Sequence, residues 1–160
     1  MSTPSVWHRK RPAGVRITIM DATPFSLQIL SPEKNFFDGD VEEIIFSTPE
    51  GSIGIMRGHS PMIAAVSEGV VEILENGERK IAAVGQGFCE IDYKRAVFYL
   101  DTAEWAEDID VARAKEALDR ANHRIHNIQS KKEYMRTQAS ISRALARLKA
   151  AESGSGHNHH

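Results

Sequence analysis

The spacing of hydrophobic residues changes once along the chain, near residue 105. Between Phe25 and Asp101, short runs rich in Val, Ile and Phe alternate with Gly, Asn, Asp and Pro, which is the pattern of a small antiparallel sheet protein. The predicted strands are FSLQIL, VEEIIFS, MIAAV, GVVEIL, KIAAV, GFCEI and AVFYL. Because so many short strands cannot each cover one face of a sheet alone, we expect a sandwich or a flattened barrel.

Two turns are predicted within this region. Asn76-Gly77 supplies the two positive φ angles of a type I′ turn and so indicates a hairpin between GVVEILE and ERKIAAV. A second turn is expected at residues 92–95, DYKR, between GFCEI and AVFYL. The glycine-rich segment GSIGIMRGHSPM, residues 51–62, fits neither common phosphate-binding pattern and precedes no helix, so we interpret it as turns.

After Trp105, apolar residues recur every three or four positions, which predicts helices. The first predicted helix carries the stripe Ala114, Leu118, Ala121, Ile125 and Ile128. The second carries the stripe Tyr134, Gln138, Ile141, Leu145 and Leu148. Two matched stripes, separated by the polar segment 129–133, predict an antiparallel helical hairpin. Asp108 is the expected N-cap of the first helix, with Asp110 in its first turn.

The contact between the two predicted helices is weak. Its stripes contain Ala114, Ala121 and Gln138 where a robust coiled coil would place large aliphatic residues. Each fully buried Leu or Ile contributes roughly 1.5–3 kcal/mol, whereas ordering each backbone residue costs about 1–2 kcal/mol. We therefore expect the hairpin to depend on the sandwich, a ligand or a partner for its conformation, and to be able to open.

The predicted fold class is a mainly β N-terminal sandwich followed by an α-helical C-terminal hairpin. The expected division is a basic, disordered extension at 1–20, a β-sandwich domain at 21–105, a helical hairpin at 106–152 and a flexible tail at 153–160. Residues 1–19 contain basic residues and no acid, so an organellar targeting peptide is the alternative for this extension.

Charge is divided unevenly along the chain. The net charge is −2, yet residues 1–107 carry 10 Lys+Arg against 16 Asp+Glu, whereas residues 108–160 carry 10 against 6. A basic appendage on an acidic body suggests an acidic partner surface, and nucleic acid is a weaker candidate because acids are interleaved with the bases. No apolar run approaches the roughly 20 residues needed to span a membrane. The single cysteine, Cys89, is expected to be a small buried residue, which fits a reducing compartment.

Candidate catalytic chemistry is sparse. His59 and Ser60 are adjacent, but neighbours on an extended strand point to opposite faces and no acid is placed to orient the imidazole, so we expect no hydrolase triad. His123 and His126 are three residues apart on the first predicted helix and could share a metal ion. No third ligand has a supporting spacing, so a solvated histidine face is the favoured interpretation.

The segment GSIGIMRGHSP, residues 51–61, resembles the G-x-x-G-I-x-x-G-H-x-P signature of ATP synthase epsilon subunits. Around it FSLQILSPEKNFFDGDVEEI, AVGQGFCEI and YLDTAEWAEDIDVARAKEAL fall in the family's order, and the likeness extends over about residues 25–152. The resemblance implies a non-catalytic rotor subunit of a proton-translocating F-type ATP synthase, held at the cytoplasmic face of the bacterial membrane through the complex. A free-standing ATP-responsive binding module is the alternative.

The implied partners are the gamma subunit and the rotor ring, which the sandwich would contact at the foot of the central stalk. The two helices would reach the alpha/beta hexamer when extended and impede ATP hydrolysis there. Ser52 and His59 fall in the segment implied to contact partners. Ser52 stands where many members have an acid and Arg57 where proline is common, so the charged contact with the rotor ring is expected to differ.

The resemblance also implies a regulatory ATP site, with no required cofactor. IDVARA, residues 109–114, matches the I/L-D-x-x-R-A motif with which some bacterial epsilon subunits bind ATP, and RALAR, residues 143–147, matches an arginine pair on their second helix. The residues carried over are Asp110, Arg113, Arg143, Arg147 and Glu104. A solvated charged face, with Asp110 favoured by the helix dipole, is the alternative.

Overall fold

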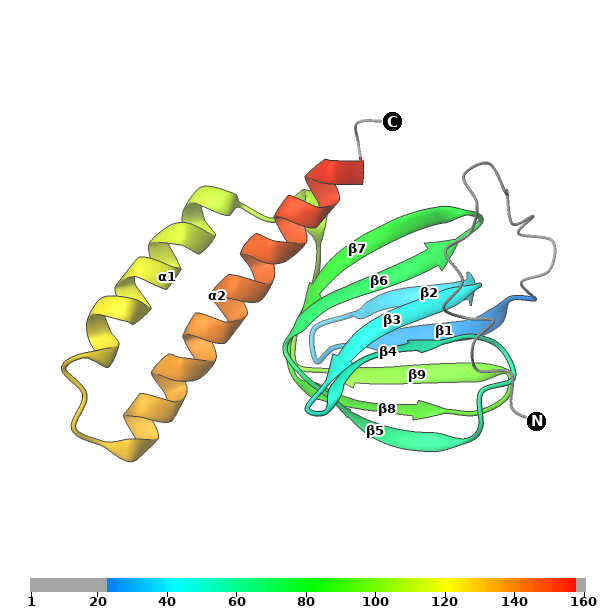
Figure 1. The fold of residues 1–160 in the computed structure, drawn as a ribbon, viewed down its shortest axis with the longest axis horizontal. Coiled ribbons are helices and arrows are strands. Elements are labelled where there is room, and N and C mark those ends of the chain that lie inside the picture. Colours follow the sequence, from blue (N-terminus) through cyan, green and yellow to red (C-terminus); the bar gives the residue numbers. More distant parts are fainter. Residues whose placement is uncertain (1–22, 158–160) are drawn as a thin grey trace, which may run out of the picture.

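The computed structural model describes residues 23–157, so the predicted extension at 1–20 lies outside the described residues. Within them a run of strands precedes two helices, as Figure 1 shows. The strands are β1 (Phe25–Leu30), β2 (Asn35–Val41), β3 (Glu43–Thr48), β4 (Gly51–Ile55), β5 (Met62–Val66), β6 (Gly69–Glu75), β7 (Glu78–Val84), β8 (Gly87–Ile91), β9 (Arg95–Leu100) and β10 (Ala103–Trp105). A 3-10 turn (Ala106–Asp108) leads to α1 (Val111–Ile125) and α2 (Lys131–His157).

The strands form two five-stranded sheets that face each other. Sheet A has the order β2-β1-β9-β8-β5, and sheet B has the order β10-β7-β6-β3-β4. β1 and β9 run parallel, and the other neighbouring strands are antiparallel. The predicted fold class, a mainly β N-terminal sandwich with an α-helical C-terminal hairpin, is confirmed.

The main core lies between the inner faces of the two sheets. Phe25, Leu27 and Ile29 alternate with less buried residues along β1, as expected for a strand covered on one face. Phe46 of β3 meets Phe98 of β9 edge to face, with ring centroids 4.9 Å apart, and so joins the sheets across the core. Cys89 is fully buried here, and burial raises the pKa of its thiol to about 11.

Both predicted turns are confirmed. Asn76 and Gly77, between β6 and β7, have φ angles of 51° and 79°. The Asn76 N–H donates a hydrogen bond of 3.1 Å to the buried carboxylate of Glu42, which ties this turn to the β2–β3 connection. Between β8 and β9, the Asp92 carboxylate accepts a hydrogen bond of 2.9 Å from the Lys94 N–H.

The interpretation of residues 51–62 as turns is wrong for the first part of this segment, which forms strand β4. β4 is the edge strand of sheet B and pairs with β3. Only Ile53 and Ile55 carry apolar side chains from β4 towards the core, and the two glycines and the serine at the other positions obscure the alternation of the strand. Residues 56–61 form the connection to β5.

β2 and β10 are absent from the strands predicted from the sequence. β2 contains two acids and a glycine, and β10 has only 3 residues, so neither has a clear alternating pattern. Phe36 of β2 stacks on Trp105 of β10 with ring centroids 4.4 Å apart, and Phe37 meets the same ring edge-on at 6.2 Å. This aromatic contact joins the edge strands of sheets A and B and closes one side of the sandwich.

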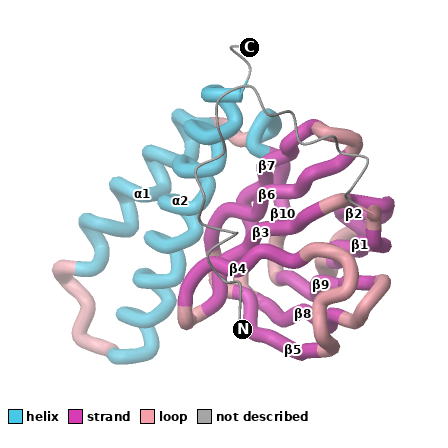
Figure 2. Tube along the Cα trace, turned by 45° about the vertical axis from the view of Figure 1, so that its right-hand side comes forward, coloured by secondary structure: helices cyan, strands magenta, loops and turns pink. Residues whose placement is uncertain are grey.

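α2 lies between α1 and sheet B, as the two directions of view in Figures 1 and 2 show. It contacts α1 on one side and β6 and β7 on the other. Because α2 has neighbours on two sides, its buried residues follow two faces instead of the single predicted stripe. These residues are Thr137, Ala144, Ala146, Ala150 and Ala151.

The predicted stripe of the second helix is therefore wrong in part. Tyr134 and Leu145 are 48% and 51% exposed, and Gln138 is exposed as well. Ile141 and Leu148, from the same stripe, are half-buried. The small side chains next to these positions carry the burial, because they let α2 approach both of its neighbours closely.

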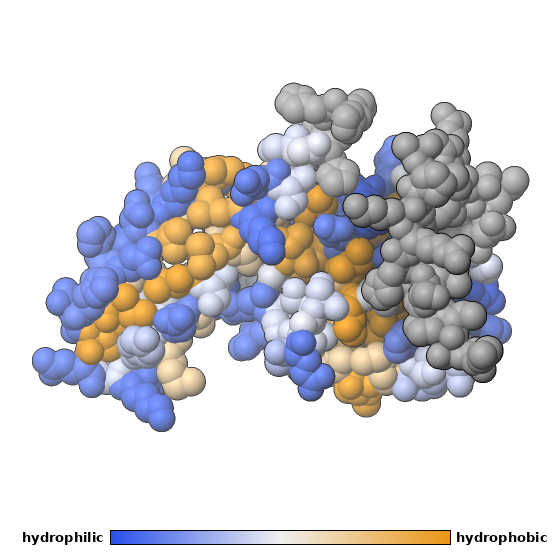
Figure 3. All heavy atoms as spheres, in the orientation of Figure 1, coloured by the Kyte–Doolittle hydropathy of each residue, from blue (hydrophilic) through white to orange (hydrophobic). Residues whose placement is uncertain are grey.

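α1 presents its predicted stripe to α2, and Figure 3 shows hydrophilic side chains along its outer edge with apolar ones between the helices. Its N-cap is Asp110, which corrects the prediction of Asp108. The Asp110 Oδ1 accepts a hydrogen bond of 3.0 Å from the Arg113 N–H. Asp108 instead ends the 3-10 turn, because the next residue, Ile109, is extended and buried.

α2 continues to His157, beyond the predicted end of the hairpin at residue 152 and into the predicted flexible tail. A contact with the 3-10 turn and a hydrogen bond within α2 hold the extra turn. Gly154 lies against Ala106 of the 3-10 turn, and the Ser155 hydroxyl donates a hydrogen bond of 2.9 Å to the Ala151 carbonyl oxygen. Buried alanines of α2 and of the 3-10 turn form a small second core with β7.

The second core attaches the hairpin closely but weakly. Its buried members are Ile81, Ala83, Ala106, Ile109, Ala150 and Ala151. Alanine buries little apolar surface, and burial contributes roughly 25 cal/mol per Å². The main core, by contrast, is built from Phe, Leu, Ile and Val.

We expect Gly154→Leu to weaken the attachment of α2 to the sandwich. A Cβ at position 154 would lie 2.8 Å from the Ala106 Cβ, whereas nothing lies within 4 Å of a Cβ at position 156. Overpacking of this kind costs about 1–3 kcal/mol. Amide hydrogen exchange in α2 should therefore be faster in Gly154→Leu than in the unsubstituted protein.

Gly156→Leu is the matched control for this substitution. Both changes raise helix propensity, by up to about 1 kcal/mol, but only the side chain at position 154 would meet Ala106 of the 3-10 turn. Exchange in Gly156→Leu should be unchanged or slower. Equal exchange rates in the two variants would contradict the attachment of α2 described above.

Candidate functional site

A cleft of about 350 Å³ lies between α1, α2 and the strands β7 and β10, and we call it the hairpin cleft. Three of the residues implied for nucleotide binding line it, namely Glu104 of β10 and Arg143 and Arg147 of α2. The hydroxyls of Thr102 and Ser140 are the other polar groups of its lining, and alanines and a valine form the rest. The cleft thus combines charged groups with a partly apolar wall.

Glu104 and Arg147 form a two-pronged ion pair that joins β10 to α2. The Arg147 Nε donates to Glu104 Oε2 at 2.8 Å, and the Arg147 Nη2 donates to Glu104 Oε1 at 3.2 Å. Both side chains are about one-third exposed, so we expect this pair to stabilise the folded hairpin by only about 1 kcal/mol. Its paired geometry fixes the position of α2 against the edge of sheet B.

Arg143 is the cation of the cleft that is available to an anion. Its Nη2 donates a hydrogen bond of 3.3 Å to the Ser140 hydroxyl, and the side chain is exposed. Within residues 23–157, no carboxylate lies within 4.0 Å of its guanidinium group. An anion in the cleft would therefore meet one guanidinium that no carboxylate holds in an ion pair, beside another that Glu104 already holds.

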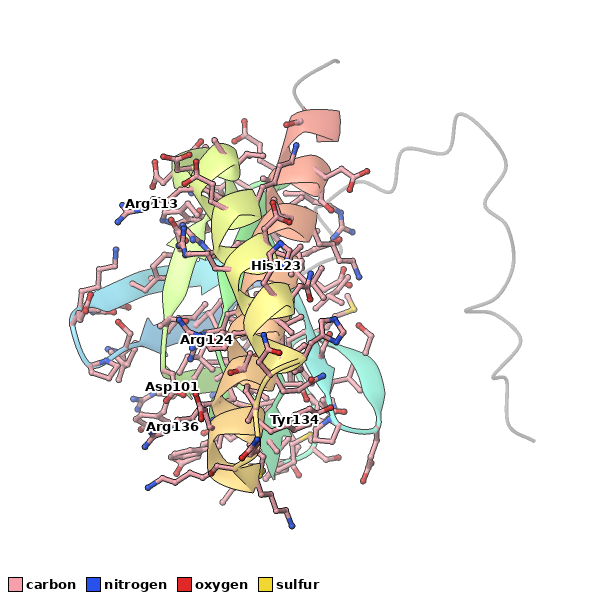
Figure 4. The ribbon with its side chains drawn as sticks, turned by 90° about the vertical axis from the view of Figure 1, so that its left-hand side faces the viewer. Asp101, Arg113, His123, Arg124, Tyr134 and Arg136 are labelled. Carbon is pink, nitrogen blue, oxygen red and sulfur yellow. The ribbon has the colours of Figure 1, made fainter. Side chains whose placement is uncertain are left out.

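Asp110 and Arg113 are not part of the cleft lining. Both lie at the start of α1, where the Asp110 carboxylate caps the helix through the Arg113 N–H. This cap explains why an aspartate stands at position 110 even in the absence of a ligand. It agrees with the alternative interpretation of the motif, in which Asp110 is favoured by its place at the start of the helix. Arg113 is exposed, and Figure 4 shows its side chain pointing away from α2.

Arginines line both helices on the side of the hairpin cleft, and we call this surface the basic groove. On each helix the second arginine follows the first by seven residues, and the third follows the second by four. Ala117 of α1 and Ser140 of α2 lie four residues after the first arginine of their helix and line the cleft, so the arginines share that face. Figure 4 shows three of them on one side of the hairpin, with Tyr134 on the other. The arginines are Arg113, Arg120 and Arg124 of α1 and Arg136, Arg143 and Arg147 of α2.

Three members of the basic groove, Arg120, Arg124 and Arg136, are absent from the site predicted from the sequence. The repeated spacing of arginine was the signal that could have found them. It became informative only once the two helices were known to be antiparallel neighbours.

Glu68, in the connection between β5 and β6, lies beneath α2. It lines a cleft between sheet B and α2 and a second cleft between α2 and the ends of β5 and β8, and Ser142 lines both. Burial raises the pKa of the Glu68 carboxyl; the Arg143 guanidinium opposes this and Asp101 adds to it. The net shift is upward, so the folded state binds the Glu68 proton more tightly than the unfolded chain does.

Ser52 and His59, the residues implied in partner contacts, lie in different surroundings. The Ser52 hydroxyl, on β4, donates a hydrogen bond of 3.4 Å to the Phe46 carbonyl oxygen, and Ser52 borders the cleft between sheet B and α2. His59 lies in the connection after β4, with its Nδ1 2.8 Å from the Ser60 carbonyl oxygen. The structure does not bring the two side chains into one site.

No metal site is formed by the part of the chain that the structure describes. Residues 23–157 hold no group of three His, Cys, Asp or Glu side chains that could bind a metal ion. His123 and His126 are exposed, and Figure 4 shows His123 on the outer side of α1. No helix in the same range has the length and apolar character needed to cross a membrane.

Two domain models of one protein family match the chain in succession. The model described as ATP synthase, Delta/Epsilon chain, beta-sandwich domain matches residues 24–106. The model described as ATP synthase, Delta/Epsilon chain, long alpha-helix domain matches residues 107–152. The chain belongs to the ATP synthase delta/epsilon chain family.

Curated relatives within this family are named ATP synthase epsilon chain. A relative from Ruminiclostridium cellulolyticum is 40% identical over 126 residues, which cover 79% of this chain and 94% of the relative. Another, from Caldanaerobacter subterraneus subsp. tengcongensis, is 41% identical over 133 residues, which cover 82% of this chain and 96% of the relative. The predicted resemblance to epsilon subunits and the predicted non-catalytic role in an ATP synthase complex are confirmed.

Solved structures of ATP synthases contain chains with the same fold. One is from the mitochondrial enzyme of Euglena gracilis, described as OSCP/F1/c-ring, with a TM-score of 0.71, 19% identity and coverage of 81% of both chains. Another is from the central stalk and c-ring of the Tetrahymena thermophila mitochondrial enzyme, with a TM-score of 0.60, 14% identity and coverage of 81% of this chain and 97% of that one. These likenesses show that this delta/epsilon family member shares the fold of chains found in those assemblies.

In this ATP synthase delta/epsilon family member, we expect Glu68 to make stability depend on pH. The folded state raises the pKa of Glu68 above its ordinary value of 4.5, so the folded chain binds this proton more tightly than the unfolded chain does. The stabilisation that this tighter proton binding gives the folded state is complete below about pH 4.5 and is lost as the pH rises through the raised pKa. Glu68→Gln should therefore raise the denaturant midpoint at pH 7 more than it does at pH 4.

Glu78→Gln, on the exposed start of β7, removes the same charge away from α2 and is the control. It should change the denaturant midpoint by a similar amount at both pH values. An effect of Glu68→Gln that is equal at pH 4 and pH 7 would show that burial of this carboxyl is not linked to folding.

Proposed function

We propose that this chain joins the gamma subunit to the membrane rotor ring of a proton-translocating ATP synthase and regulates the complex through its hairpin. In the folded state the hairpin is stored against sheet B. In the extended state it reaches the alpha/beta hexamer and inhibits ATP hydrolysis. ATP bound in the hairpin cleft would favour the folded state and so restrain inhibition.

The observation that carries this proposal is the kind of contact by which the hairpin is attached. The second core is made mostly of alanine, the Glu104–Arg147 pair is partly exposed, and clefts of about 350, 410 and 760 Å³ interrupt the contact of α2 with its neighbours. The main core of the sandwich does not include α2. Detachment of the hairpin therefore leaves the sandwich intact, which is what an element with two positions requires.

The positive charge of the hairpin supports its binding to the alpha/beta hexamer in the extended state. Residues 108–160 carry 10 Lys+Arg against 6 Asp+Glu, and three arginines on each helix belong to the basic groove. When the hairpin leaves sheet B, Arg147 loses Glu104 as its partner. Acidic surfaces on another subunit could then replace that carboxylate, and complementary charge would set the specificity of the contact.

The basic groove supports ATP as the regulatory ligand. Arg143 and Arg147 lie beside the partly apolar wall of the hairpin cleft, so phosphate groups and a base could each find a suitable surface. The cleft has walls from α1, α2 and sheet B, and it exists only when the hairpin is folded. If ATP binds this state alone, a concentration 100-fold above its dissociation constant favours the folded state by about 2.7 kcal/mol.

ATP titration of the isolated chain tests this role. Arg143→Gln should weaken ATP binding about tenfold, which corresponds to about 1.4 kcal/mol, because it removes the guanidinium of the hairpin cleft that no carboxylate holds in an ion pair. Asp110→Asn preserves the N-cap and lies outside the lining of the cleft, so it should leave ATP affinity unchanged. In the assembled complex, Arg143→Gln should stay inhibited at ATP concentrations that relieve inhibition of the unsubstituted protein.

Lys115→Gln is the control for this titration, because Lys115 is exposed on α1 and does not line the hairpin cleft. It removes one positive charge and should bind ATP normally. Unchanged affinity in Arg143→Gln would remove the proposed site. Inhibition that persists without the hairpin would instead remove its proposed action on the hexamer.

The outer face of sheet A supports attachment to the gamma subunit. Ile63 of β5, Phe88 of β8 and Tyr99 of β9 are 75%, 46% and 37% exposed. The Phe88 and Tyr99 rings are stacked with centroids 4.8 Å apart, and Figure 3 shows apolar surface along the β5 edge of the sandwich. Exposed apolar patches of this kind are typical of protein interfaces. Because α2 contacts β6 and β7 of sheet B, Ile63 and Tyr99 stay available whichever position the hairpin takes, whereas Phe88 also lines the cleft between α2 and the ends of β5 and β8.

We expect Ile63→Ser combined with Phe88→Ser to weaken binding to the purified gamma subunit at least about tenfold, because large side chains at the centre of an interface carry most of its affinity. Both residues are exposed, so the fold should survive, and circular dichroism checks this. Val111→Ser, at a residue of α1 that is 40% exposed, is the control and should bind normally. Equal affinity of both variants for gamma would assign the contact to another face.

A further inference from the structure

The cleft of about 760 Å³ between α2 and the ends of β5 and β8 has no part in the nucleotide site, and we call it the wedge cleft. Figure 1 shows how it arises, because α2 approaches the sandwich along its second half and diverges from it towards Lys131. The buried alanines of α2 all lie at or beyond Ala144. The wedge cleft therefore has one wall from the hairpin and one from the sandwich, and it shares no lining residue with the hairpin cleft.

Each wall of the wedge cleft exposes a large apolar side chain. Met135 of α2 is 62% exposed and Phe88 of β8 is 46% exposed. Ala65 of β5 and Ala139 of α2 extend the apolar part of the lining. Methionine adapts its shape to different apolar partners, and exposed apolar patches are typical of protein interfaces. The described part of the chain thus leaves an apolar surface uncovered between its two domains.

The charged side chains in the lining of the wedge cleft are both acids, Glu68 and Asp101. Within residues 23–157, neither carboxylate lies within 4.0 Å of a Lys, Arg or His side-chain nitrogen. Arg143 acts on Glu68 from outside this lining, because it lines the hairpin cleft instead. An apolar cleft with acids and no cation in its lining is complementary to a segment that carries Lys or Arg beside apolar side chains.

We propose that the partner bound on the outer face of sheet A extends a basic amphipathic segment into the wedge cleft. Phe88 belongs both to the apolar patch of sheet A and to the wedge cleft, so the two surfaces are continuous. An apolar side chain of the segment packs between Phe88 and Met135, and a Lys or Arg beside it meets Glu68 and Asp101. The inference rests on the proposed function for the identity of this partner, the gamma subunit.

A segment in the wedge cleft couples the partner to the position of the hairpin. One wall of the cleft belongs to α2, so the complete contact forms only while the hairpin is folded. The partner therefore binds the folded chain more tightly than the extended one, and by linkage it stabilises the folded hairpin. The cation also reduces the repulsion between Asp101 and Glu68, which contributes to the raised pKa of Glu68.

The test measures the affinity of the full chain for the purified gamma subunit, together with amide hydrogen exchange in α2 with and without gamma. Met135→Gln and Asp101→Asn change exposed residues, and Gln is a good helix former, so both variants should fold. Each should weaken gamma binding about tenfold, as expected when an apolar anchor or a charge partner at an interface is lost. Gamma should slow exchange in α2 of the unsubstituted protein and have less effect in both variants.

Tyr134→Gln is the matched control for Met135→Gln, because Tyr134 is 48% exposed on the same helix and does not line the wedge cleft. Glu78→Gln is the matched control for Asp101→Asn. Both controls should bind gamma normally. If only the combined Ile63→Ser and Phe88→Ser variant loses affinity, gamma binds sheet A but does not enter the wedge cleft, and this inference is wrong. Exchange in α2 that gamma leaves unchanged would overturn it as well. Equal affinity of every variant would instead remove the proposed gamma contact itself.

Discussion

The close approach of α2 to sheet B and to the 3-10 turn, which small side chains permit, is the constraint on which the helical layer depends. A Cβ at Gly154 would lie 2.8 Å from Ala106 of the 3-10 turn, and Ala150 is fully buried in the second core beside β7. This proximity lets Arg147 reach Glu104 and places α2 over Glu68. The same small side chains bury little apolar surface, so closeness and weak attachment have one cause.

The two cores of the molecule differ in strength for that reason. The sandwich core joins both sheets through large side chains such as Phe46 and Phe98, whereas the second core joins α2 to β7 and the 3-10 turn mainly through alanines. Parts of a protein with few buried apolar contacts open at lower free energy than the rest. The hairpin can therefore leave the sandwich while the sandwich stays folded, and the 3-10 turn between them is where the two cores meet.

Local patterns in the sequence predicted the parts of the fold whose structure is decided locally. The Asn76-Gly77 turn follows from backbone geometry, and the central strands follow from alternation. Strand β10 could not be predicted, because it is held by the contact of Trp105 with Phe36 from a strand far away in the sequence. The exposed position of Leu145 was equally hidden, because only the layer order shows that α2 has two neighbours.

The candidate site, too, could be predicted from the sequence only in part, because its walls come from elements that are brought together by the fold. Family resemblance pointed to Glu104, Arg143 and Arg147, and the fold brings these three to one cleft, while Asp110 serves as a helix cap. Each wall of that cleft comes from a different layer, so a ligand that touches all of them can bind only when the hairpin is folded. By linkage, a ligand in the hairpin cleft stabilises the folded hairpin, and a partner that binds the extended hairpin lowers the affinity for that ligand by the same factor. This coupling is effective because the second core is weak. A ligand that stabilises the folded hairpin by a few kcal/mol can decide its position only if the free energy that attaches the hairpin to the sandwich is of similar size.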